Sequence, residues 1–122
     1  MINTNRIVPV VATDLLTLYG NMLSIANVSV TALQATSGIG EIALDSGTGN
    51  YICAEPLKNF VFGSSVTSAT IYFIPAYDYA GFGKTGATLT IADNGVVVDK
   101  DGATLYKAVL STNTLTITKV GF

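Results

Sequence analysis

The sequence predicts a mainly β domain, an antiparallel β-sandwich or a partly closed barrel, with one N-terminal helix and an extended N-terminal arm. Three observations support this fold class. Beyond residue 27, short β-rich runs alternate with clusters of turn residues. In several of these runs Thr alternates with Leu or Ile, which makes one face of a sheet apolar and places hydroxyls on the other. Apolar residues with helical spacing occur at 13–26.

Residues 1–12 are expected to form the extended arm, and residues 13–122 a single domain. Pro9 restricts Val8 to β or polyproline geometry. The β-branched residues around it disfavour a helix because their side chains are stiff at χ1. The arm is therefore expected to be extended, and its Ile and Val side chains are apolar surface that has to be buried.

The next segment predicts a helix over 13–26. Thr13 offers an N-cap and Asp14 lies in the first turn. Gly20 weakens such a helix by about 1 kcal/mol relative to Ala, and Asn27 is a C-terminal stop. The apolar residues that follow one another at three- and four-residue steps are Leu15, Leu18, Tyr19, Met22, Leu23 and Ala26.

The rest of the chain predicts strands joined by turns that tolerate positive φ, at 93–95, 99–102 and 111–113. The last third is therefore expected to be an antiparallel meander. Gly-Ala-Thr-Leu and Thr-Leu-Thr-Ile each occur twice, but at unequal spacings, which argues against a solenoid. The expected strands are roughly 28–36, 41–44, 50–54, 58–62, 68–75, 87–92, 96–98, 103–110 and 114–120.

Composition excludes several function classes. Charged residues make up only 11% of the chain, against roughly 25% in ordinary soluble domains, so the surface is either polar and uncharged or covered by partners. The net charge of −2 and the scattered Lys and Arg residues provide no footprint for nucleic acid. No apolar run is long enough to span a membrane, and the short apolar run at 7–12 is not expected to be a signal peptide.

Residues that could carry catalysis or bind an ion are few. The chain has no His, so the lone Cys53 lacks a base and is expected to be a buried core residue. Gly83-Lys84-Thr85 is not a phosphate loop, because Asp78 stands where that motif needs Gly. We therefore expect no enzyme, no catalytic residue, no cofactor and no metal.

Two carboxylate arrangements remain as alternatives. Asp93, Asp99 and Asp101 are expected to be turn residues, with a structural cation as the other interpretation. Glu55 and Asp78 could act as a catalytic pair only if the fold brought them together.

The segment 71–82 is dense in aromatic residues. Tyr72 and Phe73 are expected to point to opposite faces of a core strand. Tyr77, Tyr79 and Phe82 follow Pro75 in a loop-like context, where aromatic side chains serve either as interface anchors or as additional core packing. This concentration of aromatic residues indicates that the segment binds a partner and does not catalyse a reaction.

Four segments together resemble small virion structural proteins of tailed bacteriophages, most closely the head decoration, or cement, proteins. The resemblance extends over most of the chain and concerns the general character of the sequence, not a single defining motif. The segments are Asn5 to Val10, Thr13 to Gly20, Ile52 to Pro56 and Tyr77 to Phe82.

The resemblance implies a protein of the capsid surface that is assembled in the host cytoplasm and binds the major capsid protein or other virion subunits. Such proteins often bind as trimers between major capsid subunits, so this chain is expected to be a homo-oligomer, for example a trimer. The arm would add backbone hydrogen bonds to a neighbouring sheet edge, while aromatic anchors fill pockets on a shell or sister subunit. The residues expected to bind the partner are Arg6, Ile7, Val8, Val10, Tyr77, Tyr79 and Phe82.

Two other functions stay open. Tyrosine faces near Asp78 suit a glycan-binding or adhesion module, in which rings stack on sugars and the carboxylate accepts hydrogen bonds from hydroxyls. A tail or fibre component of the virion is a variant of the structural interpretation.

Overall fold

The computed structural model describes residues 12–33, 41–92, 97 and 99–121, and these residues form one helix and nine strands. The helix and strands are α1 (Ala12–Ile25), β1 (Thr31–Leu33), β2 (Glu41–Leu44), β3 (Asn50–Cys53), β4 (Asn59–Phe62), β5 (Ser68–Phe73), β6 (Gly81–Lys84), β7 (Thr90–Ala92), β8 (Leu105–Ser111) and β9 (Thr114–Gly121).

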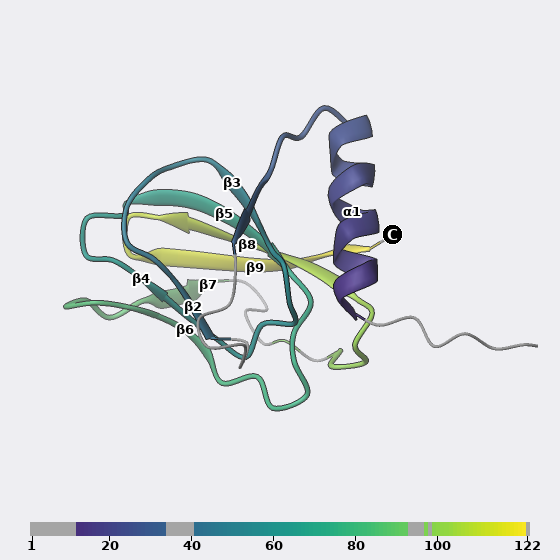
Figure 1. Cartoon of the computed structure of the whole chain (residues 1–122). Coiled ribbons are helices and arrows are strands. Elements are labelled where there is room, and N and C mark those ends of the chain that lie inside the picture. Colours follow the sequence, from purple (N-terminus) through teal and green to yellow (C-terminus); the bar gives the residue numbers. More distant parts are fainter. Residues whose placement is uncertain (1–11, 34–40, 93–96, 98, 122) are drawn as a thin grey trace, which may run out of the picture.

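The first six strands alternate between two sheets and stack as the coils of a short solenoid (Figure 1). The larger sheet has the order β1-β3-β5-β8-β9-β7 and the smaller one β2-β4-β6. All neighbours among these six strands are parallel. Thr31 lies opposite Tyr51, and Tyr51 opposite Ile71, so each coil adds 20 residues in the larger sheet.

The mainly β class and the helix are confirmed, but the sandwich or barrel and the exclusion of a solenoid were wrong. Alternating polarity shows that a strand has one buried face, but it does not tell which strand lies beside it or in which direction. Here the chain leaves a sheet after each strand and returns one coil later, so the neighbours are parallel. The coils share a geometry without sharing a sequence, and therefore no repeat was visible.

The antiparallel part is smaller than expected. β8 pairs with β5 and β9 in antiparallel fashion, and the predicted reversal at 111–113 is confirmed by Thr112 with φ of 57°. The meander was wrong for β7, because Thr90 lies opposite Thr114 in a parallel pairing with β9. Residues 93–96 lie outside the described residues, and Val97 is described without strand structure.

The strand β6 was not expected, because its sequence Gly-Phe-Gly-Lys resembles a loop. It forms because it continues the smaller sheet, with Asn59 opposite Gly81 and Phe62 opposite Lys84. The sheet supplies the hydrogen bonds that the local sequence does not favour.

Two apolar layers hold the domain together. The inner layer lies between the two sheets and centres on Phe60, Phe62 and Phe73, which are fully buried. In the outer layer α1 lies against the other face of the larger sheet, on the side away from the smaller sheet (Figure 1). Tyr72 belongs to the outer layer and Phe73 to the inner one, as their opposite directions on β5 predicted.

The helix α1 begins one residue before the expected start and ends where Asn27 adopts a φ of 65°. The Asn27 N–H donates to Ser24 O at 3.0 Å, and the Val28 N–H donates to Leu23 O at 2.8 Å. These two bonds make a Schellman motif, which satisfies carbonyls at the helix end. The side chain of Thr13, the expected N-cap, lies outside the described part of the structure.

Candidate interaction surface

The aromatic residues expected to bind a partner are divided by the fold. Tyr77 is 89% exposed. The rings of Tyr79 and Phe82 pack against Phe73, with centroids 5.8 and 5.2 Å apart, and both belong to the rim of the inner layer. Core packing, the alternative that the sequence left open, therefore describes these two residues, and Tyr77 alone of the three is presented outward.

The Tyr79 hydroxyl is buried without a hydrogen-bond partner within the described ranges. Its burial raises the pKa of this phenol, and the nearby Cys53 adds to the shift. A buried hydroxyl without a hydrogen-bond partner lowers the stability of the fold. The ring of Tyr79 therefore contributes to core packing, while its hydroxyl group is destabilising.

The loop that carries Tyr77 is tied to the neighbouring coil. The Ala76 N–H donates to Leu57 O at 2.8 Å, and the Ala80 N–H donates to Lys58 O at 2.7 Å. Lys58 Nζ lies 3.2 Å from Asp78 Oδ2, and this ammonium holds the pKa of the carboxyl below its ordinary value. The exposed ring is therefore displayed at a defined place on the surface.

Arg6, Ile7, Val8 and Val10 lie outside the described residues. The structure does describe the end of the solenoid formed by β1 and β2, the first two strands after the helix α1. β1 and β2 are the outermost strands of their sheets, and neither outer edge pairs with another described strand. Such edges present rows of backbone N–H and C=O groups that can accept an additional strand.

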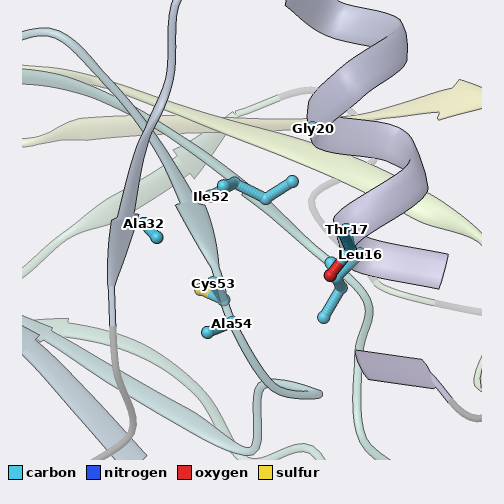
Figure 2. A pocket seen from close by; sticks show the side chains of 7 residues that line it. All are labelled: Leu16, Thr17, Gly20, Ala32, Ile52, Cys53 and Ala54. Carbon is cyan, nitrogen blue, oxygen red and sulfur yellow. The ribbon is translucent and has the colours of Figure 1, made fainter. Parts of the chain in front are cut away.

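A pocket of about 310 Å³ lies beside the β1 edge, between the helix and the larger sheet (Figure 2). In Figure 2 the Ile52 side chain reaches from β3 towards α1, with Leu16 and Thr17 facing it from the helix. The lining is mostly apolar, so the pocket suits an aliphatic side chain. The residues that line it are Leu16, Thr17, Gly20, Ala32, Ile52, Cys53 and Ala54.

A second hollow of about 270 Å³ lies on the outer face of the smaller sheet. It is formed over β2 and β4, where Ala43 and Val61 point outward opposite each other. Glu41 and Asn59 complete the lining together with Ile42. The lining of this hollow therefore contains one charged side chain, that of Glu41.

The groups that the sequence analysis considered for catalysis or ligand binding have defined surroundings. Cys53 is 1% exposed, and burial raises the pKa of its thiol, which disfavours the reactive thiolate. Among the described residues no group of three or more His, Cys, Asp or Glu comes together. Gly83-Lys84-Thr85 lies at a strand, and Lys84 Nζ donates to Thr112 O at 3.0 Å rather than facing a helix N-terminus.

The two described aspartates of the acidic turns both have protein partners. Asp101 Oδ1 accepts from the N–H groups of Ala103 and Thr104, each at 2.9 Å, and these bonds lower the pKa of the carboxyl. Asp99 pairs with Lys119. Both side chains hold the turn before β8, as the turn interpretation predicted, while Asp93 lies outside the described residues.

Comparisons with protein families, with curated proteins and with solved structures found no match to this chain. Within the described ranges, no helix has the length and apolar character that crossing a bilayer needs.

Proposed function

We propose that this chain is a non-enzymatic structural protein of a phage particle, a capsid decoration protein that binds the shell by strand addition and through an aromatic anchor. The observation that carries the proposal is the end of the solenoid where β1 and β2 leave their outer edges unpaired by any described strand. Together with the arm that the sequence predicts, the chain would then have both an edge that receives a strand and a segment that supplies one.

The edge at β1 suits an apolar strand in particular. Thr31 and Ala32 are exposed on β1, and Ala32 also lines the pocket below α1. An added strand would form backbone hydrogen bonds with β1 and place alternate side chains towards the pocket. In the same way, the edge of a sheet in the shell would accept the arm as an additional strand. Pro9 is tolerated in such an outermost strand because the N–H groups on its outer side need no partner strand.

The proposal requires the arm to reach a neighbouring subunit. Ten extended residues span at most about 33–36 Å. Among the aromatic anchors the sequence predicted, Tyr77 has the exposure to enter a pocket on that subunit. Each contact is modest, but many copies on one lattice would reinforce one another through avidity.

Particle association tests this proposal. Quantitative mass spectrometry across a density gradient of lysate should find the chain with virus-sized particles, in a large fixed ratio to the major shell protein. A few copies per particle would move the protein to a tail, portal or fibre position. Complete absence from particles would reject the structural role.

Arm deletion tests the strand-addition part of the proposal. Removing residues 1–10 should abolish co-migration with particles while the domain keeps its thermal unfolding transition. Tyr77→Ala should weaken co-migration without changing stability, because the ring is exposed. A deleted chain that no longer folds would contradict this division between arm and domain.

A glycan-binding module remains the second candidate, and the exposure of Tyr77 beside Asp78 favours it. Tyr79 no longer serves this function as a stacking platform, because its ring packs in the core. A saccharide titration compares the parent with Tyr77→Ala. Equal binding by both, or no binding by either, would remove the candidate.

A further inference from the structure

The open edge of β1 has apolar surroundings on both of its faces. On the side of α1, Ala32 borders the apolar pocket, as Figure 2 shows. On the opposite side, Leu33 packs against the inner layer between the two sheets. A strand added beside β1 would therefore meet apolar side chains on both faces, as strands do in a parallel sheet that is covered on both sides.

The backbone groups that this edge presents belong to Ala32. The Leu33 C=O accepts a hydrogen bond from the Ala54 N–H at 2.8 Å, so the backbone groups of Leu33 face β3. Successive residues of a strand direct their backbone groups to opposite edges. The N–H and C=O of Ala32 therefore face outward, where no described strand pairs with them.

The arm has the sequence that this position requires. A strand that is covered on both faces is a continuous apolar run, without polar residues at alternate positions. Residues 7–11 read Ile-Val-Pro-Val-Val, and no other segment outside the described residues contains such a run. Pro9 has no N–H, so its nitrogen has to face away from β1. The backbone groups of Val8 and Val10 then face Ala32.

The place of the arm in the chain favours docking on another copy. The helix α1 begins at Ala12, and Leu16 in its next turn already lines the pocket. To pair with its own β1, the arm would have to bend back sharply just before the helix. Pro9 suits a turn, but such turns are usually completed by Asp, Asn, Ser or Gly. The other four residues of 7–11 are all β-branched.

We propose that residues 7–11 of one copy add as a strand to the β1 edge of a second copy, parallel to β1 like the neighbouring strands β3 and β5. Pro9 lies opposite Ala32. The Ala32 N–H donates to the Val8 C=O, and the Val10 N–H donates to the Ala32 C=O. Each copy supplies one arm and receives one, so the contact is head-to-tail. This inference rests on the strand-addition part of the proposed function and names a copy of the chain as the partner.

Sedimentation equilibrium of the purified full chain tests the contact. The parent should associate reversibly as its concentration rises. Val10→Pro removes the N–H that faces Ala32 and should weaken association by at least about tenfold. Ile7→Pro is the matched control, because it removes an N–H on the outer side of the added strand, and it should keep most of the affinity. A parent that stays monomeric at every concentration, or equal weakening by the two variants, overturns the proposal.

A disulfide between two single variants distinguishes a second copy from the same chain. Pro9 and Ala32 place their side chains on one face of the proposed pairing, whereas Thr31 points to the other face. Cys53 is buried, so only the added thiols are accessible. Under a mild oxidant, a mixture of Pro9→Cys and Ala32→Cys chains should form a mixed disulfide, and a mixture of Pro9→Cys and Thr31→Cys chains should not. A disulfide that forms only when both cysteines are in one chain places the arm on its own domain and overturns the proposal.

Both measurements are made without particles, so their failure is distinguishable from failure of the proposed function. A monomeric chain that co-migrates with particles would refute the exchange of arms between copies and leave the decoration role standing. A chain that associates through its arm but is absent from particles would support the exchange and reject the decoration role.

Discussion

Substituting Gly63 by Ala tests the stacking of the coils directly. Gly63 follows β4 at the corner where the second coil passes the first, and its N–H donates to Leu44 O at 2.7 Å. A Cβ added to Gly63 would lie 2.5 Å from Asp45 O and 3.0 Å from Asp45 C and Cα. These are backbone atoms, so no side-chain rotation relieves the clash, and the two coils have to separate locally.

The cost follows from this geometry. Overpacking against a rigid neighbour costs about 1–3 kcal/mol, and loss of the inter-coil hydrogen bond adds about 1 kcal/mol. We therefore expect the free energy of unfolding to fall by about 2–4 kcal/mol, with a fall in Tm on the order of 10 °C. Urea denaturation and thermal unfolding, both followed by circular dichroism, measure the two quantities.

Gly83 is the matched control because it lies in β6 with nothing within 4 Å of an added Cβ. Gly83→Ala should change the free energy of unfolding by less than about 0.5 kcal/mol. If Gly63→Ala is as stable as Gly83→Ala, the coils do not pass each other at this corner, and the reasoning is refuted.

Three further substitutions are expected to have measurable effects. Tyr79→Phe removes a buried hydroxyl that lacks a described partner and should stabilise the domain by about 1 kcal/mol in urea denaturation; a loss of stability would reveal a partner. Gly20→Ala should raise stability by about 0.5–1 kcal/mol, because a Cβ there would lie 3.9 Å from Ile52 Cδ1, an ordinary contact; a lower Tm would contradict this. Burial raises the pKa of Cys53, so the folded thiol keeps its proton where the unfolded thiol loses it, and stability should fall as pH rises above about 8.5. Cys53→Ala should flatten this decline just above pH 8.5 in denaturant titrations; an unchanged slope would assign it to other groups.

Local features of the chain were predictable because their causes are local. The helix was expected over 13–26 and is found at Ala12–Ile25, since apolar spacing and the Asn27 stop are properties of adjacent residues. The strand at 41–44 was predicted with its observed bounds, and the reversal at 111–113 is confirmed by Thr112. Alternation of Thr with Leu or Ile also predicted strands with one buried face, as in β9, where Leu115 and Ile117 are buried.

Part of the candidate surface was predictable in the same way. Cys53 was expected in the core and is buried there, because a chain without His leaves a lone thiol no obvious chemistry. Tyr77, Tyr79 and Phe82 were recognised as one aromatic group. Their division was not predictable, since the exposure of each ring depends on where Phe73 and the neighbouring coil lie. The apolar spacing of α1 was likewise visible in the sequence, but only the packed helix distinguishes exposed Leu18 from buried Leu23.

The sequence by itself determined the length and position of the helix, most strands and the apolar character of each strand face, because these depend on neighbouring residues. Only the tertiary structure decided that successive strands enter different sheets, that β6 forms despite its glycines, and that β7 runs parallel to β9. Strand direction and partner depend on contacts between segments about one coil apart in the chain. These contacts depend on the packing of the whole inner layer, and for this reason a local pattern of residues does not predict them.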